Sequence, residues 1–331
     1  MIPSKIGCPI AGFFPCKITS LLPSVNLLIE TTVLGNIYGG CNVNGTAAAT
    51  TVDIKGGTVG AGTIDNTNKT YSRTTVSKVF GGGYGKNTYV SGNVQVNIGT
   101  SGTTTGPTIF GDVYGGGALG HVNADKNTTE GATTSENKTL VNLYGGIIFG
   151  DAYGGGLGEK VGINGATANS AALVGGDINV LLDGMAFIIS EVETTDKDEN
   201  DSPIKVVNSG RVFGSNNLCG SPNGNITVTV NKTVAGNIAR TSGTLDAKIL
   251  TDDSKYSSTY ELAAVYGGGN LASFTTSGKK TQVIIKGCSG TSIETVYGGG
   301  NAAAVPGTDV QVYGAYEIGT VFGGGNGKDK Y

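Results

Sequence analysis

Tryptophan is absent from this chain of 331 residues, histidine occurs once, and only 14% of the residues are charged. The formal net charge is −3, and lysine and arginine form no cluster. Because a protein that binds nucleic acid needs a basic surface to neutralise phosphates, we expect no nucleic-acid partner. No apolar run approaches the roughly 20 residues of a membrane helix, so we expect no membrane span.

Motifs for common active sites and cofactor sites are missing too. No G-x-S-x-G accompanies the single His121, which argues against a Ser-His-Asp hydrolase and for a histidine in a turn. Gly115–Gly120 matches G-x-G-x-x-G, but the residues that follow do not favour the helix that a dinucleotide site requires. We therefore expect no cofactor.

Residues that bind metals show no convincing pattern. The five cysteines are odd in number and fit no zinc-site spacing. Cys8 and Cys16 are close enough in sequence to pair, and free thiols are the simpler interpretation. The acidic stretch Asp196–Asp201 resembles the start of a calcium loop, but Asp201 replaces the usual glycine and Val207 the usual glutamate. We interpret the stretch as a solvated acidic loop and expect no metal site.

Glycine is abundant, at 58 of 331 residues, and much of it lies in one repeated phrase. The phrase Val-Tyr-Gly-Gly-Gly-Asn occurs in full at Val265–Asn270 and Val296–Asn301, and looser copies bring the total to eight. Successive copies place their aromatic residues 25 to 60 positions apart. These aromatic residues are Tyr38, Phe80, Tyr114, Tyr153, Phe213, Tyr266, Tyr297 and Phe322. Self-similarity of this kind predicts a repeat architecture.

Runs of alternating β-branched residues lie between the copies, as in Val94–Ile98 and Ile226–Val230. Such alternation is typical of a strand with one buried face, and the glycines that follow suit tight corners. A unit of this size cannot bury a core alone, but stacked units share one. We therefore predict an all-β fold, a β-solenoid (parallel β-helix) of about eight coils with loop insertions.

The repeats divide the chain into two parts. Residues 1–33 contain four prolines and do not fit the repeat, so we interpret them as a cap over the first coil or as sequence upstream of a displaced start codon. Residues 34–331 are predicted to form the solenoid, which we expect to continue beyond Tyr331 and to self-associate end to end through unpaired strand edges. The largest insertions are Ala118–Lys138, Gly158–Gly176 and Ile189–Val206.

Counting back from each aromatic residue aligns the repeats into columns. The residue directly before it is aliphatic, and we expect Val113, Val265, Val296 and Val321 to be buried in register. The residue two positions before it is mostly polar. This polar column reads Asn36, Lys78, Asp112, Asp151, Arg211, Ala264, Thr295 and Thr320.

The polar column contains the best candidates for catalysis. Stacking places Asp112 beside Asp151, and paired carboxylates serve as acid/base or metal-binding groups. Because Lys78 and Arg211 flank them, we favour an exposed ladder of salt bridges that contributes little to stability. Asp112 and Asp151 stay as weak catalytic candidates.

The aromatic column has two interpretations. As a buried stack it would stabilise the core. As an exposed stripe beside a flat glycine turn, Tyr114, Tyr153, Tyr266 and Tyr297 would be ligand-binding residues that stack on sugar rings. Strand alternation directs the aromatic side chains to the same side as the polar column, which is outward, but glycine corners interrupt alternation. Both interpretations remain open.

The repeated phrase, together with strands such as Asn93–Ile98 between its copies, resembles glycine-rich repeat proteins on the surface of gut anaerobes and, more broadly, secreted bacterial β-helical adhesins. The resemblance covers residues 34–331 and implies a secreted or cell-surface location. It implies a non-enzymatic stalk or adhesin segment that contacts glycans or host or bacterial surface proteins. The alternative is a carbohydrate-active β-helix, meaning a polysaccharide lyase, a hydrolase or a phage-spike-like protein, with the polar column as its groove.

Overall fold

The computed structural model describes residues 16–17, 23–28, 30–65, 70–103, 105–125, 136–233 and 260–327. Over these residues the predicted all-β class is confirmed, since one short 3-10 helix, η1 (Cys288–Gly290), accompanies 29 strands. The strands form long parallel sheets whose neighbouring strands come from successive repeats, an arrangement compatible with a β-helix. The described part contains no helix with the length and hydropathy needed to traverse a bilayer.

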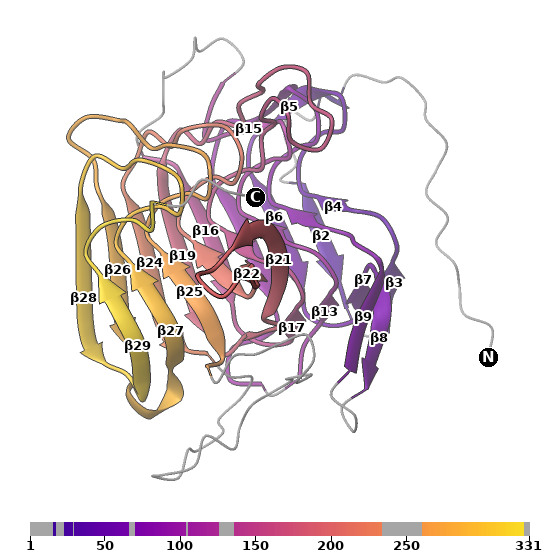
Figure 1. Ribbon diagram of the computed structural model, residues 1–331. Helices are drawn as coiled ribbons and strands as arrows, with labels where there is room; N and C mark the ends of the chain where they lie inside the picture. Colours follow the sequence, from indigo (N-terminus) through magenta and orange to yellow (C-terminus); the bar gives the residue numbers. More distant parts are fainter. Residues whose placement is uncertain are drawn as a thin grey trace.

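The alternating runs of the sequence form one eight-stranded sheet among the described residues, seen edge to edge from β28 to β2 in Figure 1. Every neighbouring pair in it is parallel. In order, its strands are β2 (Ser24–Leu27), β6 (Thr50–Ile54), β12 (Val94–Ile98), β16 (Lys138–Leu143), β19 (Asp177–Asp183), β24 (Ile226–Lys232), β26 (Thr281–Lys286) and β28 (Thr308–Gly314).

The repeated phrase forms a second eight-stranded parallel sheet in the described part of the chain, called the aromatic sheet below. Each strand ends on its aromatic residue because the glycine turn follows at once. In order, the strands are β4 (Ile37–Tyr38), β10 (Val79–Phe80), β14 (Val113–Tyr114), β18 (Ala152–Tyr153), β23 (Arg211–Phe213), β25 (Leu262–Tyr266), β27 (Ser292–Tyr297) and β29 (Glu317–Phe322).

Two shorter parallel sheets complete the turns of the chain. One contains β3 (Thr32–Val33), β7 (Thr58–Val59), β13 (Thr108–Ile109), β17 (Ile147–Ile148) and β20 (Ala186–Phe187). The other contains β1 (Cys16–Lys17), β5 (Asn44–Ala47), β11 (Asn87–Val90) and β15 (His121–Val122).

Two antiparallel hairpins project from the described sheets, each inserted just before a strand of the aromatic sheet. The first joins β8 (Ala61–Asp65) to β9 (Thr70–Thr75), and its Tyr71 packs against Phe110 and Phe149. The second joins β21 (Ser190–Lys197) to β22 (Pro203–Ser209), and Figure 1 draws it in dark red in front of the sheets. The insertion expected as a loop at Ile189–Val206 is therefore a hairpin.

Part of the segment 1–33 belongs to the same sheets, because β1, β2 and β3 pair in parallel with β5, β6 and β7. In β2, Val25 and Leu27 lie opposite Val52 and Ile54. The described residues therefore show no structural break after residue 33. The phrase appears only from Ile37 because it lies late in each turn of the chain.

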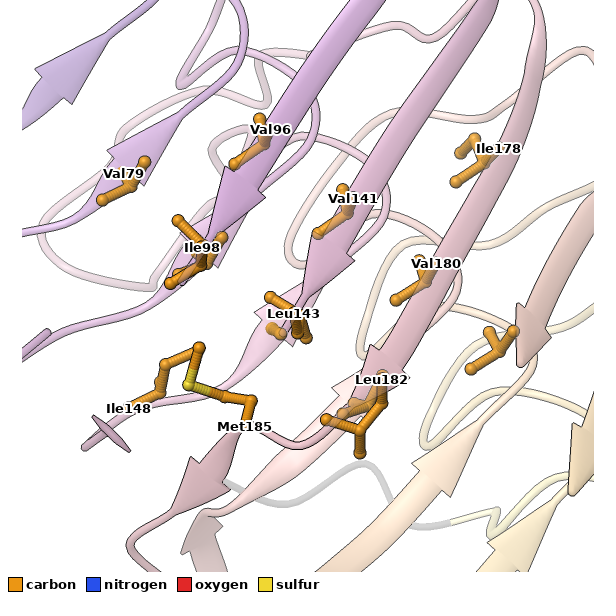
Figure 2. Close-up of a cluster of buried hydrophobic side chains, with 14 of the residues drawn as sticks. Val79, Val96, Ile98, Val141, Leu143, Ile148, Ile178, Val180, Leu182 and Met185 are labelled. Carbon is orange, nitrogen blue, oxygen red and sulfur yellow. The ribbon is translucent and has the colours of Figure 1, made fainter. Parts of the chain in front are cut away.

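The core consists of aliphatic side chains stacked in rows along the parallel strands. Figure 2 shows Val96, Val141 and Val180 in one row and Ile98, Leu143 and Leu182 in the next, as the strand register requires. These side chains are almost completely excluded from solvent. Each contributes roughly 1.5–3 kcal/mol through burial, so stacking supplies the core that one repeat lacks.

The aliphatic column before the aromatic residues is buried as predicted at three of four positions. Val113, Val265 and Val296 are 0% exposed, whereas Val321 is 46% exposed, which corrects the prediction for that residue. Val321 lies in β29, the outermost strand of the aromatic sheet within the described residues, so a neighbour covers only one side of it.

Glycine follows each aromatic residue because neighbouring turns approach closely there. A Cβ atom on Gly115 would collide with the carbonyl oxygen of Gly154 and with the side chain of Val141. The turn after β14 therefore excludes any side chain at this position. The backbones of the two neighbouring turns lie close enough to hydrogen-bond, and the Gly115 N–H donates to the carbonyl of Tyr153 at 2.9 Å.

Candidate functional site

The eight aromatic side chains form one continuous stack, called the aromatic ladder below. Neighbouring ring centroids lie 4.6 to 5.1 Å apart, and the planes of each pair differ by 10° or less. Parallel strands in register are spaced by about 4.8 Å, which is also a favourable distance for offset ring stacking. The ladder clusters separately from the aliphatic core, so the rings lie on the other face of the sheet.

Stacking removes the surface that the tyrosines were expected to offer to sugars. Tyr114, Tyr153, Tyr266 and Tyr297 each have a neighbouring ring on both faces. Tyr114 is 0% exposed and Tyr266 only 4%. A sugar ring therefore has no open aromatic face at these four positions.

Buried phenol groups of the ladder are hydrogen-bonded to the polar column. The Tyr114 hydroxyl donates to Asp112 at 3.1 Å, and the Tyr153 hydroxyl donates to Asp151 at 3.2 Å. Burial raises the pKa of both phenols well above the ordinary value of 10.0, and the neighbouring carboxylates add to the rise.

Alkali is expected to unfold the protein rather than ionise these two phenols in the native state. A group whose folded-state pKa exceeds its unfolded value stabilises the fold fully below the unfolded pKa, and that contribution is lost as the pH rises through the folded pKa. Tyrosinate absorbance and circular dichroism should therefore change together for Tyr114 and Tyr153. The double variant Tyr114→Phe, Tyr153→Phe should unfold at a higher pH. Ionisation of every phenol without loss of structure would contradict the burial.

The polar column forms the predicted ladder of ion pairs. Lys78 lies 2.7 Å from Asp112, and Arg211 lies 2.7 Å from Asp151. The carboxylates also accept backbone hydrogen bonds from the next strand, from Asp151 N–H to Asp112 at 3.1 Å and from Arg211 N–H to Asp151 at 2.9 Å. Each charged side chain thus joins two repeats.

One of these pairs is more deeply buried than the sequence suggested. The side chains of Arg211 and Asp151 are only 6% and 5% exposed, whereas Lys78 and Asp112 are 29% and 20% exposed. Burial works to raise the pKa of both carboxyls. At Asp112 the charge and hydrogen bond of Lys78 outweigh burial and lower the pKa, while at Asp151 burial prevails over Arg211 and the pKa is raised. The expectation of a wholly exposed ladder is therefore wrong.

Asp112 and Asp151 have little capacity left for catalysis. Both oxygens of Asp112 accept hydrogen bonds, from Tyr114, Lys78 and the Asp151 amide. Both oxygens of Asp151 do so as well, from Arg211 and Tyr153. A general acid or base must reach the substrate, and these contacts hold both carboxylates inside the ladder.

Asparagines that follow the glycine turns form a second ladder. Asn326 donates to Asn301 at 2.8 Å, Asn301 to Asn270 and Asn270 to Asn217 at 2.9 Å each. Asn217 in turn donates to the Tyr114 hydroxyl at 2.8 Å. The spacing of the repeats does not show that the amides of these asparagines hydrogen-bond to one another.

A cavity of about 760 Å³, called the hairpin groove below, lies between hairpin β21–β22 and the end of the aromatic sheet. Its hairpin wall includes Glu191, Glu193, Thr194, Asp196 and Lys205. Its sheet wall includes Ala263, Ala264, Tyr266, Glu294, Thr295 and Tyr297. The volume lies in the range of small-molecule sites, and both polar and apolar side chains line the cavity.

Glu294 is the functional candidate that sequence reasoning missed. It lies three positions before Tyr297, where the other repeats have glycine, serine or alanine. This glutamate at a position otherwise held by small residues was the signal in the sequence that could have identified the candidate. Burial raises the pKa of the Glu294 carboxyl, and the charge of Glu191 on the opposite wall adds to the rise. Perturbed carboxyls within a cavity are typical of functional sites, although ion-pair networks perturb them as well.

The remaining candidates from the sequence have structural roles. Asp198 accepts hydrogen bonds from the amides of Asn200 and Ser202, both at 2.9 Å, so the acidic stretch shapes the turn of the hairpin. Among the described residues, no group of three or more histidine, cysteine or acidic side chains is placed to hold a metal ion. His121 accepts the Leu173 amide hydrogen at its Nδ1 atom over 3.2 Å.

The three cysteines whose side chains are described contribute no site. Cys41 is buried in its glycine turn, while Cys219 and Cys288 carry free thiols at partly and fully exposed positions. Cys8, and the side chain of Cys16, lie outside the described residues, so the interpretation of free thiols at these two positions stays a prediction.

Comparison with known proteins finds no matching family model, no matching curated protein and no matching solved structure.

Proposed function

We propose that this chain is a non-enzymatic segment of a secreted or cell-surface protein, a structural stalk or adhesin built as a β-solenoid of about eight coils. The aromatic ladder carries the proposal. Eight rings in unbroken register require that each turn of chain stack directly on the previous one. A solenoid of this kind offers a long, stiff surface and keeps its edges at the two ends.

The contacts that the candidate catalytic residues Asp112 and Asp151 make support a non-enzymatic role. The carboxylates of the polar column form ion pairs and accept hydrogen bonds from backbone amides, and Asp151 is nearly inaccessible to solvent. The repeated side chains thus serve cohesion between coils. The parts that vary between repeats, chiefly the two hairpins, make the contacts with glycans or surface proteins.

Saccharide cleavage is the second candidate function, and one observation favours it. Glu191 and Glu294 line the same cavity, and the pKa of Glu294 is raised by burial and by the charge of Glu191. A pair of carboxyls, one of them a general acid with a raised pKa, is the usual arrangement for glycoside hydrolysis.

Product analysis separates the two functions. The full chain would be incubated with neutral and acidic polysaccharides, and the products assayed for new reducing ends and for unsaturated uronates. A stalk or adhesin generates neither. Cleavage that disappears in Glu294→Gln but persists in Asp112→Asn would establish the enzyme and place its site in the hairpin groove.

Location is tested independently on cells that produce the protein naturally. Antibodies against the folded chain should label intact cells or detect the protein in the medium. Labelling that requires permeabilised cells would overturn the secreted or surface location.

A further inference from the structure

The hairpin groove has carboxylates on both walls. Glu191, Glu193 and Asp196 come from β21, and Glu294 comes from β27 on the opposite side. Within the part of the chain that the structure describes, two cationic residues line it, and the guanidinium of Arg211 is already engaged with Asp151 at 2.7 Å. Lys205 lies beside Glu193, its partner across the two strands of the hairpin. Carboxylates therefore outnumber cations, and the groove disfavours an anionic ligand.

Hydrogen-bonding groups also line the groove. Thr194 and Thr195 from β21, Asn208 from β22 and Thr295 from β27 all line the cavity. Hydroxyl and amide groups both donate and accept, so they suit a ligand rich in hydroxyls. The volume of about 760 Å³ exceeds what a single ion or water cluster needs and suits an extended organic ligand.

The aromatic residues of the groove cannot supply the usual stacking contact with a sugar. Tyr266 and Tyr297 line the cavity, but their rings stack on each other at 4.7 Å and on Phe213 and Phe322 beyond. Only ring edges and hydroxyls face the groove. Recognition must therefore come from hydrogen bonds, and charge-assisted hydrogen bonds are about twice as strong as neutral ones.

We propose that the hairpin groove binds an oligosaccharide of amino sugars, with its ammonium groups on Glu191 and Glu294 and its hydroxyls on the threonines and Asn208. The inference rests on the proposed adhesin function and names the ligand of that adhesin. Glu294 supports the assignment, because a glutamate replaces the small residue of every other repeat at a position that lines the groove.

Isothermal titration calorimetry of the full chain with matched tetrasaccharides tests the ligand. The glucosamine tetramer should bind. The N-acetylglucosamine tetramer, which has the same backbone without ammonium charge, should bind at least tenfold more weakly. A tetramer of galacturonate should show no binding. Equal affinity for the charged and the acetylated tetramers would overturn the role of charge, and equal affinity for tetralysine would overturn the sugar assignment.

Variants test the place of binding. Glu294→Gln and Glu191→Gln should each weaken binding of the glucosamine tetramer about tenfold or more, as expected for loss of a charge-assisted hydrogen bond. Glu191→Gln changes a hairpin residue and still tests the groove if Glu294→Gln does not fold. Glu136→Gln removes an exposed carboxylate outside the groove and should bind as the unaltered protein does.

Unchanged binding in all the groove variants would overturn the assignment of the groove. Such a failure would leave the proposed function intact, because that function falls only if the chain cleaves polysaccharides or stays inside the cell. Binding without cleavage, lost in the groove variants, supports both.

Discussion

Val296→Asp is expected to unfold the coils around β27. The side chain of Val296 is 0% exposed and lies in the aliphatic core between Val265 and Val321 of the neighbouring strands. A carboxylate placed there has no partner and no water, so the loss of stability should be at least about 4 kcal/mol. Thermal melting followed by circular dichroism, together with limited proteolysis, measures the loss.

Val321→Asp is the matched control for this prediction. Val321 holds the same column position one strand away, but 46% of it is exposed, so the same change should cost less than about 1 kcal/mol. Equal melting of Val296→Asp and the unaltered protein would show that the column does not face the core.

Arg211→Ala is the second change with a large expected effect. It leaves the carboxylate of Asp151 buried without its cation, which typically costs about 3–5 kcal/mol. It also removes the cation above the Phe213 ring, where the guanidinium carbon lies 5.2 Å from the ring centroid. Denaturant unfolding of the purified chain measures the difference.

Lys78→Ala supplies the matched comparison, because it breaks the same kind of pair where the side chains are 29% and 20% exposed. Its cost should not exceed about 1 kcal/mol. The double variant Arg211→Met, Asp151→Asn should recover part of the loss, because it removes the unpaired buried charge and keeps a side-chain oxygen that accepts the backbone N–H of residue 211. Similar effects of Arg211→Ala and Lys78→Ala would contradict the difference in burial.

Much of the fold was predictable because, in parallel strands in register, equivalent positions of successive repeats lie side by side. Aligning the repeats on their aromatic residues placed Lys78 beside Asp112 and Asp151 beside Arg211, and the structure pairs both. The same alignment predicted the burial of Val113, Val265 and Val296. No comparable rule covers β1 to β3, whose strands lack the repeated phrase, so their membership of the sheets was missed.

The candidate site was less predictable because it depends on where an insertion folds back. Alternation within residues 190–209 does not say which coils the hairpin overlies. The sequence placed Glu191 and Glu193 within the insertion Ile189–Val206, and it did not show that they would lie across a cavity from Glu294. The direction of the aromatic side chains was correctly outward, but outward did not mean exposed, because each ring covers the next.

Distances between spin labels along the main sheet test the stacking of the coils most directly. Thr51, Asn179, Gln282 and Asp309 occupy one outward-facing row of its register, in strands β6, β19, β26 and β28. With the native cysteines replaced, nitroxide pairs from position 51 to 179, 282 and 309 span three, five and six strand steps. At about 4.8 Å per step the distances should rise linearly, from about 14 to about 24 and about 29 Å. Distances that do not increase in this order, or that do not increase in proportion to the number of strand steps, would contradict the stacked coils.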